Sequence, residues 1–439
     1  MKTSAWSSVL LMAAGVTVIA GNIQSAAAAT LCVNPKVASC YSTIGKAVDA
    51  ASAGDTIQVA PGKYIEGDIV IGRSLSLIGA DADKTVINAK GKGNGIYIDG
   101  LDNPSLSEVV VRGFTIQNAN FEGILVTNAS SITISDNIVV SNTLALDVSD
   151  PANPKCPGTP AFETNEDFDC GEGIHLSGVD HSIVANNRVK NNSGGILLSD
   201  DTGETHDNLI TGNIVKGNPF DCGITLASHA LYGKAPTSLR GIDHNTISEN
   251  TSSGNGLAIP GAGAGVGLFI SGPGLATSGN VVIGNRLTGN GLPGVAMHQH
   301  TPNPLQSLND NLIVGNYIAS NAGDSDVPTT VPTGISLLGT SAVSGTVITL
   351  NEFARESIDI AINNAGGTVD VHLNSLKGSG IGIDNSGAGA VNAVENWWGC
   401  AKGPGAQGCT SVSGSNVVST PFLTSPPGPD DEQGRSSDK

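Results

Sequence analysis

One short phrase recurs along this chain and limits what the chain can fold into: asparagine, any residue, an apolar residue, two further residues and asparagine again. It spans residues 137–142, 187–192, 213–218, 245–250, 285–290 and 316–321. Each copy is followed, directly or after a loop, by a glycine and alternating apolar residues, as in Gly195-Ile-Leu-Leu. A phrase that recurs in this way predicts a solenoid of stacked coils.

The alternation after each glycine has the two-residue period of a β-strand. Each strand is too short to bury enough apolar surface alone, so like strands must stack, about 4.8 Å apart. A parallel β-helix meets this requirement. The asparagines are expected at its corners, where Asn tolerates left-handed backbone angles and its amide can hydrogen-bond from coil to coil. The expected inner file of apolar side chains is Ile124, Ile174, Ile196, Ile224, Val295, Ile335 and Ile381.

The sequence divides into predicted segments that suit an exported solenoid. Lys2, the apolar stretch after it and four alanines at 26–29 are typical of a secretory signal peptide. The segments are a signal peptide at 1–29, an N-terminal cap at 30–53, the β-helix at 54–394 with an insertion at 143–172, a C-terminal cap at 395–424 and a disordered tail at 425–439.

Both ends of the solenoid carry residues suited to covering it. One face of a short amphipathic helix, opened by Ser42 or Thr43, is expected to bury Ile44, Ala47, Val48 and Ala51. At the other end, Trp397 and Trp398 can cover the apolar interior of the last coil. Such caps hide strand edges from other chains.

Charge and hydropathy restrict the partners. The net charge of -18 argues against nucleic acid and against a strongly anionic lipid surface. The apolar part of the leader is too short to span a membrane, and no later stretch approaches the required length. The sequence therefore predicts a secreted or periplasmic protein.

Cysteine usage agrees with export. Three pairs lie close enough in sequence to close small loops: Cys32 with Cys40, Cys156 with Cys170, and Cys400 with Cys409. We expect these pairs to be disulfides, since exported proteins use them freely. Cys222 is left over and is expected to be a buried, unreactive thiol.

Several segments resemble a known superfamily. Residues 41–51, the stretch Gly54-Asp-Thr-Ile-Gln-Val-Ala-Pro-Gly-Lys-Tyr64 and Leu75-Ser-Leu-Ile-Gly-Ala resemble the entry of pectin-lyase-like right-handed β-helix proteins. The asparagine phrases are similar to the generic repeats of that superfamily, and Asn396-Trp-Trp-Gly-Cys resembles the closing segment of secreted bacterial members. The resemblance implies an all-β, right-handed, single-stranded parallel β-helix. It does not imply one activity, because the superfamily holds lyases, hydrolases, esterases, epimerases and non-catalytic surface proteins.

The motifs of the individual enzyme families are missing. Gly113-Phe-Thr-Ile-Gln-Asn118 is similar to a segment of pectin methylesterases, but the Gln and Asp motifs that should follow are absent, which argues against that activity. The Arg-x-Pro-x-x-Arg phrase of pectate lyases is also absent. Asp200-Asp201 resembles one short phrase of the polygalacturonases.

Aligning the repeats assembles one candidate site. Placing Gly123 opposite Gly173 puts Glu122 and Glu172 at equivalent positions of consecutive repeat coils, and His175 then points outward. Two carboxyls so close share a proton, bind a cation such as Ca²⁺, or extend into solvent as an ordinary polar face. With a histidine beside them they also suit acid–base chemistry on a glycosidic bond. The predicted catalytic residues are Glu122, Glu172, His175, Asp200 and Asp201, and the predicted carbohydrate-binding residues are Asp169, Glu204 and His206.

His298 and His300 form a second candidate. They lie two residues apart, so both can face outward from one strand as half of a Zn²⁺ or Cu²⁺ site. No third ligand is evident from the sequence, and hydrogen bonding at a loop edge is the competing interpretation.

The sequence leaves three classes of function open. The first is binding or processing of a polysaccharide or cell-surface glycan along one face, with a lyase or hydrolase acting through Glu122, Glu172 and His175. The second is a non-catalytic surface or adhesion protein. The third is a periplasmic accessory protein of a metalloenzyme. Only His298 and His300 point to this class.

Overall fold

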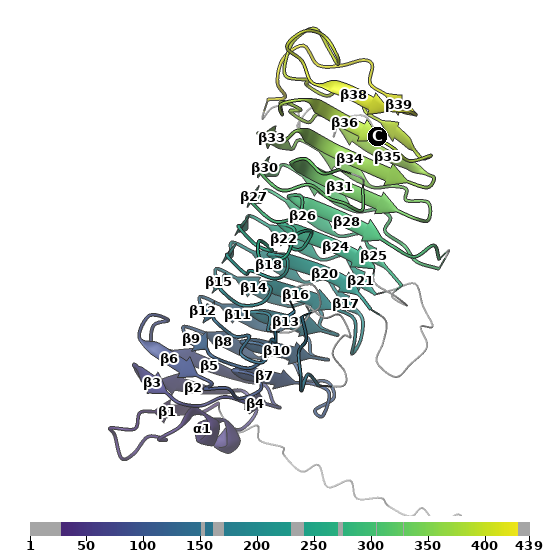
Figure 1. The fold of residues 1–439 in the computed structure, drawn as a ribbon. Helices are drawn as coiled ribbons and strands as arrows, with labels where there is room; N and C mark the ends of the chain where they lie inside the picture. Colours follow the sequence, from purple (N-terminus) through teal and green to yellow (C-terminus); the bar gives the residue numbers. More distant parts are fainter. Residues whose placement is uncertain are drawn as a thin grey trace, which may run out of the picture.

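The structure is a computed structural model, and it describes residues 28–150, 154–160, 171–229, 241–270, 275–303, 305–327 and 329–428. Across these residues the chain winds as a right-handed parallel β-helix, the predicted fold, with its coils stacked along one axis (Figure 1). Nearly all of the predicted signal peptide, and residues 429–439 of the predicted tail, lie outside the described residues.

Each coil contributes strands to sheets that run the length of the solenoid. The 14-stranded sheet holds β1 (Thr30–Val33), β2 (Asp55–Val59), β5 (Leu75–Gly79), β8 (Val110–Arg112), β11 (Thr133–Ser135), β14 (Ile183–Ala185), β18 (Leu209–Thr211), β22 (Thr246–Ser248), β26 (Val281–Ile283), β29 (Leu312–Val314), β32 (Val347–Thr349), β35 (Thr368–His372), β37 (Ala390–Asn392) and β39 (Val417–Val418). The 10-stranded sheet holds β3 (Gly62–Tyr64), β6 (Thr85–Asn88), β9 (Thr115–Gln117), β12 (Ile138–Val140), β15 (Arg188–Lys190), β19 (Ile214–Lys216), β23 (Thr251–Ser253), β27 (Arg286–Thr288), β30 (Tyr317–Ala319) and β33 (Glu352–Ala354).

Two further sheets complete the coils. The 12-stranded sheet holds β4 (Ile69–Ile71), β7 (Ile96–Asp99), β10 (Ile124–Thr127), β13 (Ile174–Ser177), β16 (Ile196–Ser199), β20 (Ile224–Ser228), β24 (Val266–Ile270), β28 (Val295–Gln299), β31 (Thr333–Gly339), β34 (Ile358–Asn364), β36 (Ile381–Asn385) and β38 (Ser411–Gly414). The 3-stranded sheet holds β17 (Thr205–His206), β21 (Ile242–Asp243) and β25 (Thr277–Ser278).

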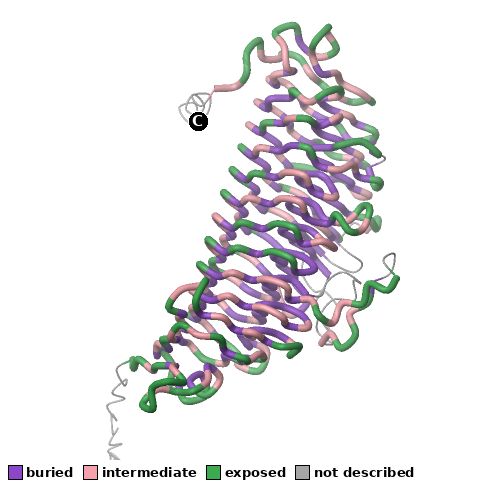
Figure 2. The backbone as a smooth tube through the Cα atoms, turned by 60° about the vertical axis from the view of Figure 1, so that its left-hand side comes forward, coloured by how far each residue is buried: buried purple, intermediate pink, exposed green. Residues whose placement is uncertain are grey.

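The register of the 12-stranded sheet confirms most of the predicted inner file. Ile124 pairs with Ile174, Ile174 with Ile196, and the file continues through Val295 and Ile335, all with 1% exposure or less. Buried residues, drawn in purple, recur in coil after coil along the solenoid (Figure 2).

The assignment of Ile381 to this file is wrong. The chain offers two successive glycine–isoleucine pairs, and the second supplies the inner residue: Ile383 aligns with Ile360, which aligns with Ile335. Ile381 pairs with Ile358 and packs with it in a separate cluster that includes Leu338. The repeat alone does not say which of two adjacent glycine–isoleucine pairs enters the stack.

Buried asparagine ladders hold the corners together, as predicted. Asn250, for example, donates its amide to Asn285 Oδ1 at 3.0 Å and accepts from the amide of Asn213 at 3.0 Å. The left-handed residues, however, are those just before the ladder asparagines, such as Asn186 and Glu249. A second ladder, through Asn290 and Asn321, ends on a carboxylate. Glu356 Oε1 accepts from the backbone N–H of Asn321 at 3.1 Å and from its amide at 3.0 Å.

The first coil is covered as expected. Helix α1 (Ile44–Ala50) begins after Thr43, whose hydroxyl accepts from the backbone N–H of Lys46, and it buries Ile44, Ala47 and Val48. Ala51, just after the helix, is also buried. At the other end Trp398 is fully buried in the core, while Trp397 is partly exposed.

Two of the predicted disulfides are present, Cys32–Cys40 and Cys400–Cys409, and Cys222 is free and buried. Cys170 lies outside the described residues, so its pairing with Cys156 stays a prediction. Within the predicted insertion, Asp147 and Lys155 form an antiparallel bridge.

Candidate functional site

Glu122 and Glu172 lie on adjacent coils, as the repeat register predicts. Each precedes the glycine that leads into a strand of the 12-stranded sheet, β10 and β13 respectively. The N–H of Gly123 donates to the carbonyl of Glu172 at 3.1 Å, which fixes the two residues side by side. Their exposures are 0% and 1%, so they are not the solvated face that was the competing expectation.

His175 joins the two carboxyls from the outer surface of β13. It faces outward because its neighbours Ile174 and Leu176 fill the core, yet it is only 1% exposed. Its Nε2 lies 2.8 Å from the hydroxyl of Ser199 on the next strand. One atom from each of Glu122, Glu172 and His175 lies within 4.8 Å of the other two. We call these three residues the glutamate–histidine cluster.

Burial sets the protonation of this cluster. Loss of water raises the pKa of Glu122 to about 7 from its ordinary 4.5, against the opposing effect of its hydrogen bonds with backbone N–H groups. Burial also lowers the pKa of His175 to about 4, although the negative charge of Asp201 acts the other way. Near pH 7, Glu122 is therefore part protonated and His175 is neutral.

The end of the predicted insertion covers the cluster. The backbone N–H of Gly171 approaches Glu122 Oε1 at 3.5 Å. On the next coil Gly194 occupies the position equivalent to Glu172, and its missing side chain leaves room for the Glu172 carboxyl. A Cβ added there would meet Glu172 Oε1 and Asp221 Oδ2, each at 3.2 Å.

Asp200 and Asp201 follow β16, at the strand end away from the two glutamates, and they differ in their contacts. Asp200 stabilises the end of the neighbouring strand β20. Its carboxylate oxygens accept hydrogen bonds from the Ser228 hydroxyl at 2.7 Å and from the backbone N–H of His229 at 2.5 Å. Burial raises the pKa of Asp200. Asp201 Oδ2 lies 3.6 Å from Nδ1 of His229, and its charge reaches His175.

His229 was missed by the sequence analysis although the repeat contains the signal. Aligning Gly195 with Gly223 puts His229 opposite Asp201, one coil further on. His229 is 9% exposed, and its positive form disfavours protonation of His175. Asp201 and His229 thus place two charged groups near His175, at the strand end away from the two glutamates.

The structure does not bring the predicted carbohydrate-binding residues to this cluster. Asp169 lies outside the described residues. Asp180 follows β13 at the strand end away from the two glutamates. His206 forms an isolated parallel β-bridge with Asp180 there. There His206 joins His181 and Asp207 in a largely exposed group of side chains. Glu204 is partly exposed, just before β17.

His298 and His300 also lie away from the cluster. His298 is on β28, four strands along the 12-stranded sheet from β13, which corresponds to about 19 Å at the usual strand spacing. The structure adds two acidic neighbours that sequence reasoning missed, Asp324 and Asp326. Both lie in the loop before β31. This loop contains no copy of the repeat phrase, so the repeat alignment could not place its residues.

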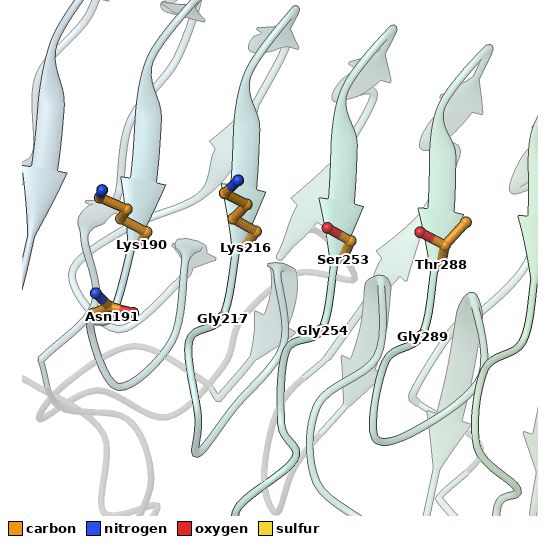
Figure 3. Close-up of a pocket in the computed structure, with 8 residues that line it drawn as sticks. All are labelled: Lys190, Asn191, Lys216, Gly217, Ser253, Gly254, Thr288 and Gly289. Carbon is orange, nitrogen blue, oxygen red and sulfur yellow. The ribbon is translucent and has the colours of Figure 1, made fainter.

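A shallow groove of about 460 Å³ crosses the ends of β15, β19, β23 and β27 (Figure 3). Lys190 and Lys216 pair in register and extend side by side along one wall. Asn191 also lines the groove, three residues before Gly194. The groove and the glutamate–histidine cluster therefore share the turn that joins β15 to β16.

The chain belongs to the right-handed β-helix family. Residues 81–304 match the family model described as a right handed beta helix region, which is more than half of the chain. The comparison with curated protein sequences returned no match. Within the part of the chain that the structure describes, no helix combines the length and the apolarity needed to cross a bilayer.

Solved structures share the fold at low sequence identity. The catalytic domain of a GH87 alpha-1,3-glucanase in complex with tetrasaccharides is 14% identical with a TM-score of 0.57, and the alignment covers 89% of this chain and 67% of that one. The Dettilon tailspike protein is 12% identical with a TM-score of 0.53, covering 88% and 66%. The DFA-IIIase from Arthrobacter chlorophenolicus A6 without its lid is 12% identical with a TM-score of 0.51, covering 87% and 96%. The chain thus spans about two thirds of the tailspike's length.

Proposed function

We propose that this protein is an exported enzyme that binds a polysaccharide along the turns of its solenoid and cleaves a glycosidic bond at the glutamate–histidine cluster. The observation that carries the proposal is the buried carboxyl pair, Glu122 with Glu172, next to a neutral imidazole. Elsewhere in the fold, buried Glu356 has an evident structural role at the end of an asparagine ladder. Glu122 Oε2 has no hydrogen-bond partner among the described residues.

Such a pair can supply both an acid and a base. Two carboxyls at this distance do not both ionise readily, so one proton is retained near neutral pH. As the glycosidic bond breaks, Glu122, with its raised pKa, donates that proton to the leaving oxygen, and the carboxylate of Glu172 bonds to the sugar carbon. Water then cleaves this glycosyl–enzyme bond and returns a proton to Glu122. Inverting glycosidases hold their carboxyls about 6.5–9.5 Å apart to admit a water, which this cluster does not match. The pair therefore favours retention of configuration if the reaction is hydrolysis.

Neutral His175 has a positioning role in this scheme. A positive imidazole beside Glu122 would favour the ionised carboxyl and remove the acid. Because burial keeps His175 neutral, it can hold a hydrogen bond with Ser199 and still leave Glu122 protonated. Asp200 fixes the adjacent turn, and Asp201 lies next to His229.

The groove beside the cluster supports binding of an extended chain. Its floor is formed by repeated turns, and Lys190 and Lys216 offer donors to sugar hydroxyls or carboxylates. These lysines give an acidic protein a local positive strip, which lessens the repulsion of a uronate polymer. The two disulfides support an oxidising, secreted or periplasmic location.

The test is to incubate the purified protein with neutral and uronate polysaccharides, while reading new reducing ends and the absorbance of unsaturated uronate in parallel. Reducing ends alone indicate hydrolysis, and both signals together indicate a lyase. Glu172→Gln should abolish turnover while preserving the fold. The matched control is Glu356→Gln, the same substitution at a buried carboxyl outside the cluster, which should retain turnover.

Two results would contradict the proposal. Turnover that survives in Glu172→Gln would place the chemistry elsewhere. Binding without any turnover across the panel would instead assign the chain to the non-catalytic surface proteins.

A further inference from the structure

Three side chains converge at the end of β28 and the loop before β31. His300 Nε2 lies 2.9 Å from Asp326 Oδ2, and His298 Nδ1 lies 3.7 Å from the same oxygen. The rings of His298 and His300 are 5.2 Å apart between centroids. One donor atom from each of these three residues lies within 4.8 Å of the other two.

A buried fourth residue orders this group from behind. Asp324 is 1% exposed, and its Oδ2 lies 2.6 Å from His298 Nε2. Its other oxygen accepts the backbone N–H of Asp326 at 3.0 Å. The same carboxylate therefore orients the ring of one residue and the main chain of another.

The contact with Asp324 determines which ring nitrogen of His298 is available. A carboxylate only accepts hydrogen bonds, so Nε2 carries the hydrogen and donates it to Asp324, and Nδ1 presents a lone pair toward Asp326. Metal-binding histidines are held in this manner, with the second ring nitrogen donating to a carboxylate behind the site. His298 is 3% exposed, so its ring is fixed in place before any ion arrives.

We propose that His298, His300 and Asp326 bind a Zn²⁺ ion. Two imidazole nitrogens and one carboxylate oxygen suit a borderline cation such as Zn²⁺, and they suit Ca²⁺ or Mg²⁺ poorly because these prefer oxygen. The side chains of His300 and Asp326 are 48% and 47% exposed, so an ion can enter from solvent and keep a water as its fourth ligand. The site lies four strands from His175 and is independent of the proposed polysaccharide chemistry.

A second histidine group provides the matched control. His181, His206 and Asp207 also bring donor atoms within 4.8 Å of one another. In that group the Nδ1 atoms of His181 and His206 each face a sequence neighbour, Asp180 at 2.6 Å and Asp207 at 2.8 Å. All of these side chains are at least 20% exposed, so the group lacks the buried orienting carboxylate.

The test is titration of untagged, EDTA-treated protein with ZnCl₂ by isothermal calorimetry, together with the visible absorption of the Co²⁺-loaded form. We expect one high-affinity site. It should be lost in His300→Ala, be weakened about 10- to 100-fold in Asp324→Asn, and be unchanged in His206→Ala. His300 is on the surface, so its replacement should preserve the circular dichroism spectrum.

Three results would overturn the proposal. The first is the absence of saturable Zn²⁺ binding by the parent protein. The second is unchanged binding in His300→Ala. The third is loss of binding in His206→Ala, which would assign the ion to the exposed group instead.

Discussion

Replacing Glu356 with glutamine should make the protein relatively more stable as the pH rises. Glu356 is fully buried, and burial raises its pKa to about 7 from an ordinary 4.5. The folded chain therefore holds this proton more tightly than the unfolded chain does. The stability that comes with the proton is present below about pH 4.5 and is lost as the pH rises through 7.

The size of the effect follows from that pKa. Each tenfold change in proton affinity between folded and unfolded states is worth about 1.4 kcal/mol, so the buried charge costs about 3 kcal/mol at pH 8. Glutamine keeps the oxygen that accepts from Asn321 and never ionises. The variant should therefore gain about 2.5 kcal/mol relative to the parent between pH 5 and pH 8, since a small part of the cost is already present at pH 5.

Urea unfolding followed by circular dichroism at pH 5, 6, 7 and 8 measures this difference. The matched control is Glu352→Gln, because the side chain of Glu352 is 49% exposed and pairs with Lys377 at the surface. Its effect should not vary over the same range. A parent–variant difference for Glu356→Gln that stays constant from pH 5 to pH 8 would refute the reasoning.

Three further predictions follow from the fold. Asn250→Ala should lower the free energy of unfolding in urea by about 3–5 kcal/mol, because it leaves buried partners in two neighbouring coils without hydrogen bonds. A change near zero would show that the ladder does not stabilise the stack. Ile196→Asp should prevent folding, as measured by soluble yield and circular dichroism, because it places an unpaired charge in the core, and a native-like spectrum would count against the inner file. Peptide mapping without reductant should find Cys156 joined to Cys170, and a bridge from either residue to a distant cysteine would disprove that pairing.

The repeat phrase predicts most of the fold because it repeats one physical requirement. Each glycine–apolar run needs the same inward position, so Ile124, Ile174 and Ile196 can be aligned by spacing alone. Spacing alone does not place Ile381, because Ile381 and Ile383 each follow a glycine and either could occupy the inward position. The pairing of Ile383 with Ile360 decides between them. The left-handed residues are likewise not readable from the ladder, since Glu249 adopts that conformation as well as Asn186.

The candidate site was only partly predictable for a related reason. The repeat register predicts that Glu122 lies beside Glu172 and that His175 points outward. It does not predict which loops cover these three residues. Their burial depends on covering loops that carry no repeat, as the contact from Gly171 illustrates. Asp326 shows the same limit, because a non-repeating loop brings it to His300 from 26 residues away.

The raised pKa of Glu122 is the property on which the proposed chemistry depends, and it can be measured directly. Carbon-13 NMR of protein labelled at the glutamate carboxyls, with Glu122→Gln to assign the signal, follows this group through a pH titration. The buried pair should show one apparent pKa near 7, well separated from the exposed glutamates. A signal for Glu122 that titrates with the surface carboxyls, near 4.5, would contradict the account.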